Sequence, residues 1–153
     1  MKVVRRIQRY SDSALIEAQI LREINERKAP YVVRMLEYFE FQQHVCISFE
    51  QLGPSLYDVL KKNEYVPLGE EFVLEVGRQL LAALAYLHDT CKCVHTDLKL
   101  ENILLASPEP LREGSPGQMP RYTPRSNSIR IIDFGGATFE DAHHSSIINT
   151  RQS

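Results

Sequence analysis

Two short polar motifs, each next to an apolar run, constrain the fold of this chain more than any other feature. The first motif covers residues 95–102 (HTDLKLEN) and precedes the apolar run Ile103–Leu105. The second covers residues 133–135 (DFG) and follows the apolar run Ile129–Ile132. Short apolar runs of this kind are typical of buried strands. We therefore expect two short strands that give both polar motifs a rigid base.

The stretch between these two runs has a different composition. Residues 107–128 (SPEPLREGSPGQMPRYTPRSNS) are rich in Pro, Ser and Gly. Such a stretch cannot bury much apolar surface, and its turn-forming residues interrupt regular structure. We predict a surface insertion here.

A helix with an acidic residue on its apolar face is expected near the start of the chain. The cluster Ser11–Ser13 can cap a helix over residues 14–28, which stops before Pro30. Glu17 lies at helical spacing from three apolar residues, so it shares their face. These residues are Ile20, Leu21 and Ile24. A carboxylate on a buried face is costly unless a cation meets it. Glu17 therefore needs a basic partner.

The segments around this helix have strand patterns. Residues 2–6 (KVVRR) begin as a β-branched strand. Residues 31–41 (YVVRMLEYFEF) and 44–50 (HVCISFE) are rich in apolar residues and are separated by Gln42–Gln43. A two-residue polar turn between such runs predicts an antiparallel pair.

Two further helices are predicted downstream. Ser55 follows Gly53–Pro54 and can cap a short helix over residues 56–63, and a longer helix is expected over residues 70–89. The apolar positions of the longer helix are expected to face the core. They are Val73, Val76, Gly77, Leu80, Leu84 and Leu87.

Charge and cysteine content exclude some classes of protein. The net charge is −2, and basic residues cluster only at the extreme N-terminus, so no direct nucleic-acid partner is expected. No apolar run is long enough to span a bilayer, so no membrane partner is expected. Cys46, Cys91 and Cys93 lack the spacing of a zinc site and are expected to be free thiols.

The two polar motifs resemble the catalytic loop (H-x-D-x-K-x-x-N) and the metal-binding D-F-G motif of eukaryotic protein kinases. The resemblance implies an α+β fold, a partial protein-kinase-like two-lobed fold with part of the antiparallel N-lobe sheet. Residues 1–50 would form the partial N-lobe, 51–54 the hinge, and 55–153 the partial C-lobe with the insertion at about 107–128.

The resemblance assigns chemistry to four residues of these motifs. Asp97 would orient the incoming hydroxyl and accept its proton, and Lys99 would offset charge on the moving phosphoryl group. Asn102 and Asp133 would supply oxygen ligands to Mg²⁺, which bridges the phosphates of ATP. His95 is expected to hold the loop, and Gly135 is expected to permit a backbone bend after Asp133.

The kinase resemblance also accounts for Glu17, because its implied partner is Lys2, which would hold the α- and β-phosphates of ATP. Residues 49–53 (FEQLG) resemble the hinge, where backbone groups of two residues would hydrogen-bond the adenine edge. The hinge and base-lining residues implied are Phe49 as gatekeeper, Glu50, Leu52, Leu104 and Ile132.

Four local segments resemble the CDC-like (LAMMER) kinases in particular. They are HTDLK, RIQRY, SFEQLGPSLYD and FGGATFEDAHHSSIINTR. The related dual-specificity tyrosine-regulated kinases are the alternative, and they typically carry a cysteine where Thr96 stands. The resemblance implies a serine/threonine or dual-specificity kinase that acts on arginine/serine-rich splicing factors. It further implies a monomer that is located in the nucleus, with the cytoplasm as a second location.

The chain also departs from the kinase pattern. No glycine-rich loop precedes Lys2, and no A-P-E element follows the D-F-G motif. We therefore expect a kinase domain truncated at both ends, poorly stable and weakly active or inactive, with apolar surface exposed around the long helix. The alternative is a truncated non-catalytic isoform or a pseudokinase-like module that binds a partner.

Overall fold

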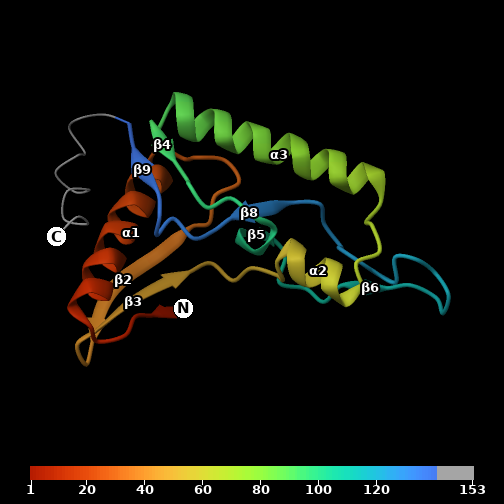
Figure 1. The fold of residues 1–153 in the computed structure, drawn as a ribbon, viewed down its shortest axis with the longest axis horizontal. Coiled ribbons are helices and arrows are strands. Elements are labelled where there is room, and N and C mark those ends of the chain that lie inside the picture. Colours follow the sequence, from red (N-terminus) through yellow and green to blue (C-terminus); the bar gives the residue numbers. More distant parts are fainter. Residues whose placement is uncertain (141–153) are drawn as a thin grey trace.

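The computed structural model describes residues 1–140. Its helices surround short sheets (Figure 1), and the predicted α+β, partial kinase-like fold is confirmed. The helices are α1 (Gln8–Glu26), α2 (Leu56–Lys62) and α3 (Glu70–Asp89), with the 3-10 turn η1 (Leu100–Asn102). The strands are β1 (Lys2–Val3), β2 (Met35–Phe41), β3 (His44–Phe49), β4 (Cys93–Val94), β5 (Ile103–Leu105), β6 (Arg112–Glu113), β7 (Tyr122–Thr123), β8 (Ile129–Ile131) and β9 (Thr138–Phe139).

Most of the segment 134–151 that supported the subfamily resemblance lies outside the described residues.

The N-terminal sheet is antiparallel, with the strand order β1-β3-β2. Lys2 pairs with Ile47 across β1 and β3. Gln42 and Gln43 have φ angles of 47° and 65°, which suit a two-residue hairpin turn between β2 and β3. The predicted hairpin is therefore confirmed, although β2 begins at Met35 and not at residue 31.

The start of α1 differs from the expected one. The helix begins at Gln8, so the polar cluster 11–13 lies inside it and does not cap it. Ser13 Oγ donates to the Arg9 carbonyl and Gln8 Nε2 donates to Asp12 Oδ1, which satisfies these side chains within the helix. The apolar face is as predicted, and Glu17 lies on it with only 3% of its surface exposed.

The two later helices have the predicted positions. Ser55 and Asp58 form a capping box at the start of α2. On α3 the buried side chains include Val76 and Leu87, whereas Val73, which was expected in the core, is 56% exposed. Val73 lies one turn before the buried stripe, where no element of residues 1–140 covers it.

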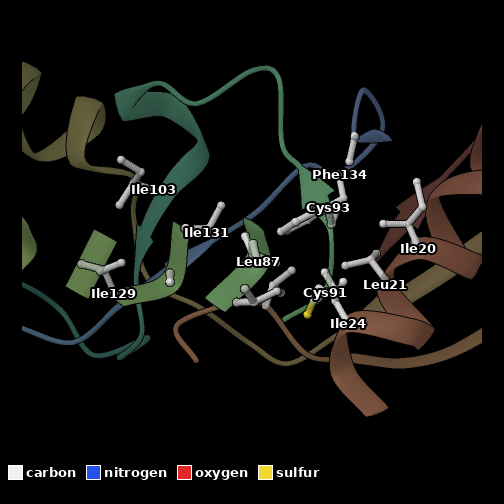
Figure 2. Close-up of a cluster of buried hydrophobic side chains, with 14 of the residues drawn as sticks. Ile20, Leu21, Ile24, Leu87, Cys91, Cys93, Ile103, Ile129, Ile131 and Phe134 are labelled. Carbon is white, nitrogen blue, oxygen red and sulfur yellow. The ribbon is translucent and has the colours of Figure 1, made fainter. Parts of the chain in front are cut away.

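A continuous hydrophobic core joins α1 and α3 to the small central sheets (Figure 2). Leu21 and Ile24 from α1 pack into the same cluster as Leu87 from α3, Ile131 from β8 and Phe134. The predicted strand pair is present, because β5 and β8 are antiparallel partners. Both polar motifs thus begin or end on strands that are anchored in this core.

The insertion at 107–128 contains a hairpin of β6 and β7. Asn63, at the end of α2, holds this hairpin through two hydrogen bonds. Its Nδ2 donates to the Tyr122 carbonyl at 2.8 Å, and its Oδ1 accepts the Tyr122 N–H at 2.8 Å. The composition of the stretch did not predict this local order. Among residues 1–140, no helix combines the length and the apolar character that crossing a membrane requires.

Candidate active site

A cavity of about 660 Å³ lies between the N-terminal sheet and the β5–β8 pair. The cavity brings together all seven predicted nucleotide-site residues and both predicted metal ligands. The lining residues are Met1, Lys2, Glu17, Val33, Phe49, Glu50, Gln51, Leu52, Asn102, Leu104, Ile132 and Asp133. Sequence reasoning missed Met1 and Val33, and it placed Gln51 in the hinge without naming it as a site residue. In the sequence, Val33 is only one of several apolar residues. Its place in the cavity wall depends on a hydrogen bond from its N–H to the distant Ile131 carbonyl.

The buried Glu17 carboxylate meets the predicted cation. Lys2 Nζ lies 2.5 Å from Glu17 Oε2, with 44% of the Lys2 side chain exposed and 4% of the Glu17 side chain. The antiparallel pairing of β1 with β3 places Lys2 over α1, and the apolar face of α1 turns Glu17 toward it. The pair therefore fixes a cation at the edge of the cavity.

Replacing Lys2 with methionine should lower the free energy of unfolding by about 1–3 kcal/mol, because the Glu17 carboxylate then stays buried without a cation. The double variant Lys2→Met/Glu17→Gln should recover part of this loss, since no buried charge remains. Urea unfolding followed by circular dichroism measures both values. Equal stabilities of the Lys2→Met variant and the wild-type chain would show that the ion pair does not stabilise the fold.

The backbone at the predicted hinge leaves polar groups for a ligand. The Glu50 N–H donates to the Arg34 carbonyl, and the Gly53 N–H donates to the Leu105 carbonyl. Within residues 1–140, the Glu50 carbonyl and the Leu52 N–H take no part in this backbone network. Glu50 and Leu52 both line the cavity, so these two backbone groups are the candidate acceptor and donor for the recognition of a planar base.

The predicted catalytic loop is held together by its own side chains. Lys99 Nζ lies 2.9 Å from Asp97 Oδ2. Asn102 Nδ2 donates to the Asp97 carbonyl at 2.9 Å and to Asp97 Oδ2 at 3.3 Å. Asp97 and Lys99 do not line the cavity, but Asn102 does. The bonds from Asn102 to Asp97 therefore connect the Asp97–Lys99 pair to the cavity wall. The Asn102 Oδ1 atom is thereby left available to a cation.

The charge on Asp97 is stabilised by its neighbours. The hydrogen bond from Lys99 is the main reason that the pKa of Asp97 is lowered from its ordinary value, with a smaller contribution from the Asn102 side chain. The same contact raises the pKa of Lys99. Asp97 is therefore a carboxylate throughout the neutral range, and the pair is lost only as the pH falls through its lowered pKa.

Substituting Lys99 with methionine should raise the pKa of Asp97 toward the ordinary aspartate value, because the largest stabilising contact of the carboxylate is removed. An NMR titration of the Asp97 carboxyl carbon measures this shift. Lys92→Met is a suitable control, since Lys92 is exposed and contributes nothing to the Asp97 shift. An unchanged Asp97 pKa in Lys99→Met would contradict the assigned contact.

His95 connects the two polar motifs, which is the holding role predicted for it. Its Nδ1 accepts the Asp97 N–H at 3.2 Å, so the proton is on Nε2, which donates to the Ile132 carbonyl at 2.8 Å. The ring packs edge-on against Phe134, with 4.8 Å between the ring centroids. The Ile132 N–H also donates to the Asn102 carbonyl. Asp97 and Asp133 therefore stand on loops that are bonded to each other.

The bend at the second motif lies at Asp133 itself and not at the predicted glycine. Asp133 has a φ of 62°, whereas Gly135 does not adopt a positive φ. Gly135 instead provides space, because a Cβ there would lie 3.2 Å from Asp133 Oδ1. Thr96 also has a positive φ, 70°, and its Oγ1 donates to the Gly136 carbonyl at 2.8 Å. This bond is the third hydrogen bond between the loops.

Asn102 and Asp133 are suitable for a magnesium ion, because both offer hard oxygen atoms to the same cavity. Within residues 1–140, no group of three or more His, Cys, Asp or Glu side chains is arranged to hold a metal. Asn102 and Asp133 would hold Mg²⁺ together with the phosphates of a nucleotide, and the ion would supply positive charge there.

The fold and this site define a protein kinase domain. The chain belongs to the protein kinase domain family, whose model matches residues 1–152. It is 41% identical to the serine/threonine-protein kinase AFC1 of Arabidopsis thaliana and 37% identical to the human dual specificity protein kinase CLK2. These alignments cover 99% of this chain and 34% and 31% of the relatives, so the chain spans about a third of their length.

Solved structures give the same result. The crystal structure of a kinase domain matches with a TM-score of 0.78 and 37% identity, over 94% of this chain and 44% of that chain. The predicted kinase family and its resemblance to CDC-like kinases are therefore confirmed.

Proposed function

We propose that this chain carries the nucleotide site and the catalytic loop of an ATP-dependent protein kinase of serine/threonine or dual specificity. One observation carries the proposal: a single cavity contains the Lys2–Glu17 pair, Asn102 and Asp133, and Asn102 is bonded directly to Asp97. Transfer of a phosphoryl group needs mainly alignment and charge neutralisation, and these residues supply both.

Each residue has a separate task in this proposal. The Lys2 ammonium binds the α- and β-phosphates of ATP, and Asn102 and Asp133 would hold Mg²⁺, which would supply positive charge beside the phosphates. The ionised Asp97 orients the substrate hydroxyl and accepts its proton, and its lowered pKa keeps it ionised at neutral pH. Lys99 faces Asp97 and offsets negative charge on the phosphoryl group during transfer.

The substrate proposal rests on the resemblance to CDC-like kinases. We infer arginine/serine-rich splicing factors as substrates, a nuclear location with the cytoplasm as a second one, and a monomeric state. The similarity to a dual specificity kinase supports hydroxyl groups of serine and threonine, with tyrosine as a further acceptor.

A second candidate function follows from the surface of α3. Leu74 and Leu81 are 65% and 71% exposed there, beside the exposed Val73. Exposed apolar patches often bind proteins. A non-catalytic module that binds a partner through α3 would have such an exposed apolar surface. The 153-residue chain alone is expected to be weakly active and poorly stable.

The deciding experiment measures transfer from [γ-³²P]ATP to three matched peptides, with repeats of Arg-Ser, Lys-Ser and Arg-Ala. The enzyme is the longest gene product that contains residues 1–153, and the 153-residue chain is assayed beside it. We expect the longer product to phosphorylate the Arg-Ser peptide faster than the Lys-Ser peptide and the Arg-Ala peptide not at all. Nucleotide binding without transfer to any peptide would favour the non-catalytic module instead.

A further inference from the structure

A second cavity, of about 480 Å³, lies where the end of α1, the end of β3 and strand β8 meet. Its polar lining comes from Asn25, Lys28, Arg34, Glu50, Ser128 and Arg130. Glu50 lines both this cavity and the nucleotide cavity, so the two lie on either side of the predicted hinge. None of the residues assigned to phosphoryl transfer, Asp97, Lys99, Asn102 or Asp133, lines the second cavity.

Positive charge is in excess in this second cavity. It contains three cations, Lys28, Arg34 and Arg130, and one acid, Glu50. Arg130 Nε lies 3.7 Å from Glu50 Oε1, and its Nη1 donates to Ser128 Oγ at 3.1 Å. Within residues 1–140, the charged groups of Lys28 and Arg34 have no ion-pair partner. A chain with a net charge of −2 therefore gathers two uncompensated positive charges in one hollow.

The walls of this cavity are held by hydrogen bonds, so the cations are carried on a fixed backbone. The Asn25 side chain donates to the Val33 carbonyl at 3.0 Å and accepts the Met35 N–H at 2.9 Å. The Arg34 N–H donates to Glu50 Oε1 at 2.9 Å, and the Glu50 N–H donates to the Arg34 carbonyl at 3.0 Å. The backbone that carries these side chains therefore needs little ordering when a ligand binds.

We propose that this second cavity binds the phosphate group of a phosphorylated serine or threonine in a peptide. Two uncompensated cations match the charge of a phosphomonoester dianion, and an arginine can bind it through two parallel hydrogen bonds. The cavity volume of about 480 Å³ exceeds what a bare phosphate needs and leaves room for the side chain that carries it. The proposal is independent of the proposed catalytic function.

The test uses the longest gene product that contains residues 1–153 and a fluorescein-labelled peptide with one phosphoserine between uncharged residues, followed by fluorescence anisotropy. Arg34→Gln and Lys28→Gln should each weaken binding by about tenfold or more, because each removes a charge-assisted hydrogen bond. Arg22→Gln is the matched control, since Arg22 is an exposed cation of α1 that does not line the cavity. Thermal unfolding verifies that each variant folds. The side chains of Lys28 and Arg34 are both exposed, so we expect at least one of the two variants to fold.

Several results would overturn the proposal. The unphosphorylated peptide could bind equally well, or Arg22→Gln could weaken binding as much as Arg34→Gln, which would indicate unspecific attraction. Displacement of the peptide by saturating MgATP would place it in the nucleotide cavity. A single-stranded oligouridylate that binds more tightly than the phosphopeptide, and loses affinity in both cavity variants, would assign the cavity to nucleic acid. Retention of full affinity in Lys28→Gln and Arg34→Gln would exclude the site altogether.

Discussion

Asp133→Asn should weaken the binding of MgATP to this chain by about 10–100-fold, because it replaces a charged metal ligand with a neutral one of the same shape. Asp133 lines the nucleotide cavity and has a backbone φ of 62°, a conformation that asparagine also tolerates. The substitution should therefore leave the fold intact. Isothermal titration calorimetry with MgATP, in the longest gene product that contains residues 1–153, measures the effect.

The dependence on magnesium distinguishes this role from a merely structural one. In EDTA the difference between the wild-type chain and Asp133→Asn should vanish or reverse, because the Asp133 carboxylate then only repels the triphosphate. Asp89→Asn serves as the control, since Asp89 ends α3 and does not line the cavity. Equal MgATP affinities of the wild-type chain and Asp133→Asn would remove Asp133 from the site.

Asp97→Asn should lower the rate of phosphoryl transfer by about 10²–10⁴-fold, which is the usual contribution of a general base. The affinity for MgATP should change little, because Asp97 does not line the nucleotide cavity. The rate is measured as kcat with an arginine/serine peptide, in the longest gene product that contains these residues. A loss of kcat at unchanged KM for ATP would separate Asp97 from the nucleotide-binding residues.

The matched control for Asp97 is an acid of the same loop. Glu101 is exposed and acts on Lys99 only through weak electrostatic attraction, so Glu101→Gln should keep kcat within about twofold. If Glu101→Gln were as inactive as Asp97→Asn, the effect would belong to the charge of the loop and not to the position of Asp97. An active Asp97→Asn variant would exclude Asp97 as the base.

Local signals predicted much of the fold correctly. The β2–β3 hairpin followed from its two-residue turn, and α2 followed from Ser55, because both depend on contacts within a few residues. The predicted start of α1 was wrong, because that prediction also depended only on neighbouring residues. Ser13 and Asp12 have side chains suited to a cap, but they bond to residues one turn earlier in a helix that has already begun.

The sequence predicted those parts of the site in which a single residue requires a particular partner. A carboxylate on the apolar face of α1 needs a cation, so Glu17 required a basic partner, and the kinase resemblance identified that partner as Lys2. The link from Thr96 to Gly136 and the positive φ of Asp133 had no such signal, because they depend on how the two loops meet. Nothing in the sequence indicated the second cavity, since Arg34 and Arg130 lie far apart along the chain. The bridge between Val32 and Ile131 brings their segments together.

The most direct measurement is a crystal structure of the chain with the ATP analogue AMP-PNP and Mg²⁺. We predict the adenine beside Leu52 and Leu104, the phosphates beside Lys2, and a metal ion bound by Asn102 and Asp133. A nucleotide bound outside the cavity of about 660 Å³, or a metal ion that neither Asn102 nor Asp133 contacts, would contradict the assignment.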